Sequence, residues 1–146
     1  MMRVLSVIAA IAVGATAVYA QSAAIGQRKE IMKSIGAAMK DPGAMAKGEA
    51  AFDLAKVQAS LKTITDGTPK LLSLYPDDSK TGGETKALPA IWEKKDEFLG
   101  IYKKLEADAK AATTAIKDEA SFKTEWPKIG ANCGTCHKTF REPPKS

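Results

Sequence analysis

The stretch DEASFKTEWPKIGANCGTCHKTFR, residues 118–141, decides the fold because it joins a helix start, an amphipathic pattern and a cysteine motif. Asp118 is a favourable N-cap residue, and Pro143-Pro144 forbid a helix from extending past about Arg141. Pro127 is expected to kink this helix or to start its regular part. The apolar residues fall close to one helical stripe, which comprises Phe122, Trp126, Ile129, Cys133, Cys136 and Phe140. The pattern therefore predicts a final helix that turns its cysteine pair toward the core.

Three further helices are predicted upstream, because the chain is rich in Ala, Lys, Glu and Leu and is punctuated by Pro and Gly. They cover about Ile25–Lys40, Glu49–Thr65 and Pro89–Ile116. Asp41-Pro42-Gly43 is expected to stop the first, and Asp66-Gly67-Thr68-Pro69 the second. Their inward stripes are Ile25, Met32, Ile35 and Met39, then Phe52, Leu54, Val57, Leu61 and Ile64, then Trp92, Phe98, Ile101, Tyr102 and Leu105.

The polar, glycine-bearing segment Pro76–Pro89 separates the second helix from the third. Such a length without apolar periodicity predicts a long surface connection, here a crossover between opposite ends of a helix bundle. Four helices with one longer connection predict an all-α fold, an antiparallel four-helix bundle.

The first twenty residues have the build of a secretory signal peptide, with Met1-Met2-Arg3 followed by the apolar run Val4–Val18. The expected cut follows Ala20, so residues 1–20 are the signal peptide and residues 21–146 form one mature domain. An uncleaved anchor is the alternative, but the run is shorter than the roughly 20 residues of a membrane-spanning helix. We therefore expect a periplasmic protein that is not embedded in the membrane.

The charge of the chain is mild, with a formal net value of +5. Lysines alternate with acidic residues, as in Glu93-Lys94-Lys95-Asp96-Glu97, which is typical of a solvated helix face. This pattern gives no basic patch of the kind that binds nucleic acid.

Cys133-Gly134-Thr135-Cys136-His137 is the C-x-x-C-H pattern of covalent haem attachment. Two thiols separated by two residues can reach the two vinyl-derived carbons of one porphyrin edge, and the adjacent imidazole then falls beneath the iron. The chain has two cysteines and one histidine in all, so haem attachment leaves no thiol for a disulfide. The motif predicts one haem c, with His137 as an axial ligand of its iron.

Other uses of a C-x-x-C pair are a redox dithiol, half of a zinc site and a simple disulfide. A thioredoxin-like motif belongs between a strand and a helix, and this sequence lacks that context. A structural zinc site needs four nitrogen or sulfur ligands, and only three candidates are present. The haem interpretation is therefore favoured over all three.

The second axial position of the iron has no histidine to fill it, but a methionine can. Met32 and Met39 share the inward stripe of the first helix, about 10 Å apart along its axis, while Met45 is expected in a turn. Only one of them can reach the iron. Ordinary core packing is the commoner role of a methionine, so the residues alone leave the ligand open.

The C-terminal C-x-x-C-H followed by Phe140-Arg141 resembles the class II cytochromes c, the cytochrome c prime family. The resemblance extends over essentially the whole mature chain and implies a four-helix bundle around one covalently bound haem c. Its supporting motifs are Gln27-Arg28 ahead of Met32, Lys47-Gly48-Glu49 ahead of Phe52-Asp53, and Pro89-Ala90-Ile91-Trp92.

The resemblance also implies roles for individual residues. High-spin members carry an apolar or aromatic residue four positions after the first-helix Arg, over a vacant distal face of the haem, whereas low-spin members carry Met there. That position is Met32, so the resemblance favours iron ligated by His137 and Met32. Arg28 matches the propionate-contacting Arg, its alternative being a plain solvated charge, and Arg141 and Trp92 are further haem-contacting candidates.

The function expected from this reading is a periplasmic electron carrier that exchanges electrons with redox partner proteins and is not an enzyme. The alternative is a five-coordinate cytochrome that binds nitric oxide or carbon monoxide, in which Met32 only packs over the haem. A haem-free structural or dithiol protein is a third class. Many members of the family that this sequence resembles form homodimers through their first two helices, and an apolar helix face here suits the core and such an interface equally.

Overall fold

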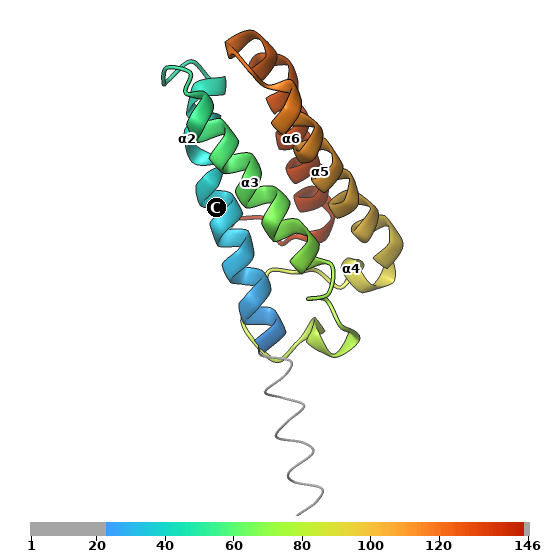
Figure 1. Ribbon diagram of the computed structural model, residues 1–146. Helices are drawn as coiled ribbons and strands as arrows, with labels where there is room; N and C mark the ends of the chain where they lie inside the picture. Colours follow the sequence, from blue (N-terminus) through green and yellow to red (C-terminus); the bar gives the residue numbers. More distant parts are fainter. Residues whose placement is uncertain (1–22, 145–146) are drawn as a thin grey trace, which may run out of the picture.

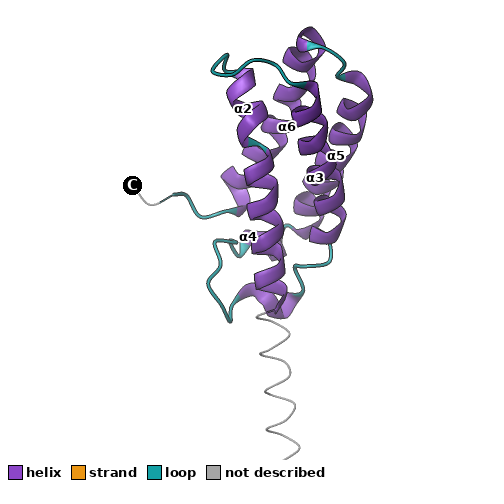
Figure 2. Cartoon of the chain, turned by 60° about the vertical axis from the view of Figure 1, so that its left-hand side comes forward, coloured by secondary structure: helices purple, strands orange, loops and turns teal. Residues whose placement is uncertain are grey.

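The computed structural model describes residues 23–144, and the predicted signal peptide with its cut after Ala20 lies outside them. The described chain is an all-α, antiparallel four-helix bundle, as predicted. Helical residues 23–38 continue into α2 (Lys40–Ala46), and α3 (Leu54–Leu71), α5 (Lys95–Ala115) and α6 (Glu119–Phe140) complete the bundle. Figures 1 and 2 show these helices side by side along one long axis, and α5 packs against both α3 and α6. No helix in residues 23–144 is long and apolar enough to cross a membrane.

The last helix, α6, matches the prediction closely. Asp118 is its N-cap: the carboxylate accepts the Ser121 N–H at 2.8 Å, and the Ser121 hydroxyl accepts the Asp118 N–H at 3.1 Å. This reciprocal arrangement satisfies two backbone donors that a helix start otherwise leaves unpaired. The helix runs through Pro127 to Phe140, and Arg141 follows in extended backbone.

The predicted stop at Asp41-Pro42-Gly43 is wrong. The helical pattern breaks at Met39 and resumes as α2, with Pro42 in its first turn, where a missing N–H is tolerated. Met45 therefore lies buried in a helix and not in a turn.

The predicted bounds of the second helix are also wrong, because α3 begins and ends later than expected. Asp53 caps its start by accepting the Lys56 N–H at 3.1 Å, so Leu54 is the first helical residue and lies exposed, not inward. The helix passes Gly67, which is a packing residue and not a stop: a Cβ there would lie 3.1 Å from Ile31 Cγ2 and 3.2 Å from Ile35 Cδ1. Glycine thus lets α3 approach the first helix closely.

The third predicted helix is divided at Lys94, whose backbone leaves the helical region. The short α4 (Ala90–Glu93) before this break holds Trp92, whose indole N–H donates to Pro76 O at 3.0 Å. This bond ties α4 to the connection after α3. The connection also contains a 3-10 turn, Asp77–Lys80, that the sequence did not indicate.

The connection is joined to the C-terminus by backbone hydrogen bonds. The Leu88 N–H donates to Phe140 O at 3.0 Å, and the Glu142 N–H donates to Lys86 O at 2.8 Å. These two bonds hold the segment before α4 beside the end of α6, close to the cysteine motif.

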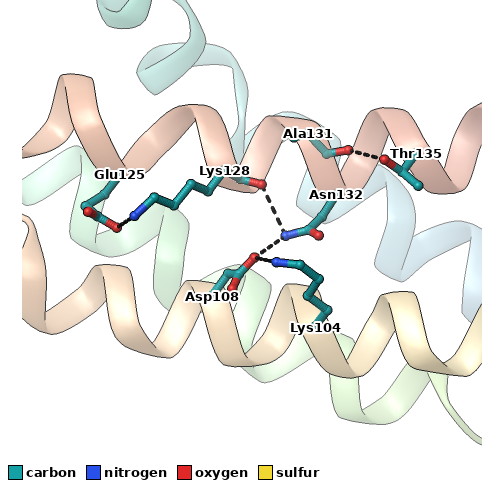
Figure 3. Close-up of polar contacts among 7 residues, drawn as sticks. All are labelled: Lys104, Asp108, Glu125, Lys128, Ala131, Asn132 and Thr135. Carbon is teal, nitrogen blue, oxygen red and sulfur yellow. Dashed lines mark hydrogen bonds and ion pairs between the residues drawn. The ribbon is translucent and has the colours of Figure 1, made fainter.

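A polar link between α5 and α6 precedes the motif directly (Figure 3). The buried Asn132 amide donates to Asp108 Oδ2 at 2.6 Å and to Lys128 O at 3.1 Å, and Asp108 is also paired with Lys104. Hydrogen bonds from Lys104 and then Asn132 hold the pKa of the Asp108 carboxyl below its ordinary value. Because the lowered pKa favours the ionised carboxylate in the folded state, this link stabilises the fold above the ordinary pKa and is lost as pH falls through the lowered one.

We predict that Asp108→Asn lowers the free energy of unfolding by about 1 kcal/mol at neutral pH, because it removes the charge of the carboxylate that accepts from Asn132 and pairs with Lys104. The difference from the unsubstituted protein should shrink in acid well below pH 3.8, the ordinary pKa of an Asp carboxyl. Urea unfolding at both pH values measures it. Asp66→Asn, in an exposed pair with Lys62, is the control and should change stability by no more than about 0.5 kcal/mol. An Asp108→Asn deficit that is equal at both pH values would contradict this account.

Candidate haem-binding site

A cavity of about 810 Å3 opens between the first helix, the connection and the last turns of α6. Its size falls within the range of cofactor sites. The residues that matter for its chemistry are Arg28, Met32, Tyr75, Phe98, Tyr102, Cys136, His137, Phe140 and Arg141. These residues come from the first helix, the connection, α5 and α6.

The two cysteines lie one helical turn apart on α6. Cys136 is 9% exposed and lines the cavity, whereas Cys133 is half-buried and is not among the residues that line it. The two thiols are not bonded to each other. Burial, with a smaller contribution from Cys133, raises the pKa of the Cys136 thiol to about 11, and burial also raises the pKa of Cys133. A redox dithiol needs a lowered thiol pKa, so this environment disfavours that alternative.

His137 is an exposed residue that also lines the cavity. Partial burial of the ring and then the nearby Arg141 charge lower the pKa of His137 below its ordinary value. The imidazole is therefore neutral at pH 7, the form whose lone pair can bind a metal.

Met32 is half-buried, packs against the hydrophobic core and lines the same cavity as His137. The two residues come from different helices, which is the arrangement that ligation of one iron from both sides requires. Met39 packs against the core and Met45 is buried in α2, and neither lines the cavity. Among these three methionines, only Met32 is placed at the site.

Arg28 is 3% exposed, so the alternative of a solvated charge is wrong. Its guanidinium donates to Ser79 Oγ at 2.9 Å, Ser79 O at 3.0 Å, Thr85 Oγ1 at 3.1 Å and Leu74 O at 3.2 Å. It also lies 4.8 Å from the centre of the Tyr75 ring. All four acceptors are neutral, so a buried positive charge is left at the cavity wall without a carboxylate partner in the described part of the chain. A haem propionate would complement it, and that contact stays a prediction.

The other two haem-contact candidates lie in different places. Arg141 lines the cavity, exposed, in an isolated β-bridge with Ala87. Trp92 does not line the cavity, but its ring packs edge-on against the Tyr75 ring, with 6.2 Å between ring centres.

Two features of this cavity were not predicted from the sequence. Tyr102 and Phe98 were expected only as core anchors, and Tyr75 was not singled out. The signal that was available for Tyr75 is its position directly before Pro76, where the connection begins beside the site.

The residues present fit a covalently bound haem better than a metal ion alone. In residues 23–144 no group of three or more His, Cys, Asp or Glu could hold a metal ion, which removes the zinc alternative for the described chain. The cavity instead combines an apolar wall, a thiol and an imidazole on one helix, and a buried cation that lacks an anion. A haem would pack its porphyrin ring on the apolar wall, bond a vinyl-derived carbon to the thiol, bind the imidazole through its iron and pair a propionate with the buried cation.

Comparison with known proteins agrees with this site. The family model described as Cytochrome C' matches residues 23–141. A "Cytochrome c'" of Rhodopseudomonas palustris is 47% identical over 140 residues, which cover 96% of each chain. A "Cytochrome c-556" of Agrobacterium fabrum is 40% identical over 128 residues, 87% of this chain and 86% of that one. The solved structure of cytochrome c' from Rhodopseudomonas palustris superposes with a TM-score of 0.80 at 51% identity, covering 84% of this chain and 98% of that one.

This chain belongs to the cytochrome c' family. The cofactor of the family is a covalently attached haem c with its iron, and the fold and the cavity described above accommodate it. The chain is therefore a c-type cytochrome with a single C-x-x-C-H attachment motif.

We predict that Arg28→Met lowers the free energy of unfolding of the haem-loaded protein by about 2–4 kcal/mol, because it breaks a buried network of charged hydrogen bonds. Chemical denaturation measures the loss. Lys29→Met is the matched control: Lys29 is exposed, with its ammonium 4.0 Å from a Glu84 oxygen, and its loss should cost no more than about 0.5 kcal/mol. Equal effects of the two substitutions would show that Arg28 does not hold the connection.

Proposed function

We propose that this chain is a periplasmic mono-haem cytochrome in which His137 binds the iron on one side and the opposite position stays open to nitric oxide or carbon monoxide. Haem iron with one protein ligand supplies a coordination site for a diatomic molecule. The name of the relative from Rhodopseudomonas palustris, "Cytochrome c'", at 47% identity supports the high-spin type within the family.

The observation that carries the proposal is that Met32 packs against the hydrophobic core beside an open stretch of the cavity wall. Gly36 lies one helical turn after Met32 and also lines the cavity, and a Cβ built on Gly36 meets no atom within 4 Å. Met32 itself already packs against the hydrophobic core. We infer that Met32 is an apolar cover, beside which a small ligand has space.

The remaining residues would tune the site without reacting. Phe98 and Phe140, both fully buried with ring centres 5.2 Å apart, form an apolar wall that excludes water. Arg28 would orient a propionate, and His137, held neutral, would supply the lone pair to the iron. Binding of a gas needs no catalytic residue, so the proposal assigns no enzymatic activity.

A second candidate is the low-spin electron carrier with iron ligated by His137 and Met32. The observation that favours it is the placement of both residues on one cavity from different helices. A relative with a different name, the "Cytochrome c-556" of Agrobacterium fabrum, is also 40% identical to this chain. His/Met ligation raises the reduction potential of haem iron, which suits exchange with redox partner proteins.

Export to the periplasm is part of the proposal. It is supported by the predicted signal peptide and by the haem-attachment motif, because haem is attached to such motifs outside the cytosol. Redox partner proteins and a homodimer also belong to the proposal and are not needed for the gas-binding test.

We predict a high-spin visible spectrum for the native haem protein, with rapid carbon monoxide binding after reduction. Met32→Ala should keep the spectrum high-spin and speed carbon monoxide binding, because it removes the apolar cover. Optical spectra and stopped-flow mixing measure both properties.

Met39→Ala is the control, since Met39 packs on the core but does not line the cavity. A low-spin native spectrum with a methionine-to-iron charge-transfer band, lost in Met32→Ala and kept in Met39→Ala, would refute the open site and establish the electron-carrier candidate.

A further inference from the structure

Two tyrosines form a hydroxyl pair in the wall of the cavity. Tyr75 precedes the connection and Tyr102 lies on α5, and their hydroxyl oxygens are 3.1 Å apart. Tyr75 is 7% exposed and Tyr102 is 3% exposed, and both line the cavity together with Cys136. Protein atoms therefore shield the pair from bulk water, and the pair borders the cavity that would hold the haem.

The hydrogen-bond count of the pair is incomplete. Two hydroxyls bring two hydrogens, and their mutual bond uses one of them. Neither oxygen donates to any other described side chain or carbonyl, so one hydroxyl hydrogen has no protein acceptor in residues 23–144. Buried donors in native proteins nearly always have a partner. The partner is therefore expected among the atoms that fill the cavity.

The surroundings keep this pair in the donor form. Burial is the largest cause that raises the pKa of both hydroxyls. The neighbouring Tyr75 raises the pKa of Tyr102 further, and Cys136 raises the pKa of both. The hydrogen bond with Tyr102 lowers the pKa of Tyr75, and the Arg28 charge, 4.8 Å from the Tyr75 ring centre, lowers the pKa of both hydroxyls, but burial outweighs these effects. Both hydroxyls thus stay protonated at neutral pH and can donate.

We propose that the Tyr75–Tyr102 pair donates one hydrogen bond to an oxygen acceptor inside the cavity, either a haem propionate or a diatomic ligand on the iron. The shared chemistry is an oxygen atom that accepts a hydrogen bond from two mutually bonded phenols. The arm of the proposal that concerns a diatomic ligand rests on the proposed function, whereas the propionate arm does not. In either case the pair is a positioning and specificity element, because it would favour ligands or haem orientations that place an oxygen within its reach.

The test uses the haem-loaded protein and the variants Tyr75→Phe, Tyr102→Phe and the double variant. The first readout is the infrared stretching frequency of carbon monoxide bound to the reduced protein. The second is the resonance Raman band of the haem propionates. Trp92→Phe is the control: it removes a hydrogen-bond donor from the same aromatic cluster, but Trp92 does not line the cavity.

If the acceptor is a diatomic ligand, the double variant shifts the carbon monoxide stretch to higher frequency, because a donor near the ligand oxygen is lost. If it is a propionate, the Raman band shifts and the carbon monoxide stretch does not. The single variant that reproduces the shift identifies the donating tyrosine, and Trp92→Phe should leave both bands in place.

The proposal is overturned if the double variant changes neither band, since the two hydroxyls then serve only each other. That outcome would be accompanied by lower stability of both single variants and partial recovery in the double, because removing both partners leaves no unpaired buried hydroxyl. If reduced protein fails to bind carbon monoxide, the open-site function fails, and the Raman band alone then decides between a propionate bond and a closed pair.

Discussion

Two thiols and an imidazole on the last turns of one helix are the constraint on which the rest of this structure depends. Cys136 and His137 line the cavity and Cys133 lies one turn before Cys136, so α6 must be fixed with this edge toward the cavity. The helix is fixed at its start by the Asp118–Ser121 capping box and before the motif by the Asn132–Asp108 bond. The bundle therefore presents a preformed attachment edge.

The opposite wall is held by a different kind of interaction. Arg28 joins the first helix to the connection through Ser79, Thr85 and Leu74, although a buried cation with only neutral partners is costly. Such a cost is reduced when an anion arrives. The guanidinium thus links the placement of the connection to the filling of the cavity, and the backbone bonds between the connection and the end of α6 carry that link across to the motif.

The fold class and the covalent motif could be predicted from the sequence because both depend on local patterns. The cap at Asp118, the stripe of α6 and the C-x-x-C-H spacing lie within one segment. The helix boundaries were harder to predict, since Pro42 is tolerated in a first turn and Gly67 serves a close contact with Ile31 and Ile35. Those roles depend on residues distant in sequence.

The cavity wall was likewise only partly predictable. The position of Met32 followed from periodicity, but the pairing of Tyr75 with Tyr102 and the four acceptors of Arg28 depend on the path of the connection. A polar segment without periodicity gives no information about that path. The spin state of the iron is harder to predict, because a methionine side chain can either pack over an iron or bind it. Relatives named cytochrome c' and cytochrome c-556 both align with this chain.

The most direct test of the central claim is the intact mass of the polypeptide, compared with that of a variant in which Cys133 and Cys136 are both replaced by alanine. The account predicts that the unsubstituted chain carries the added mass of one haem under denaturing conditions, whereas the variant carries none. An unsubstituted chain with no added haem would contradict the account.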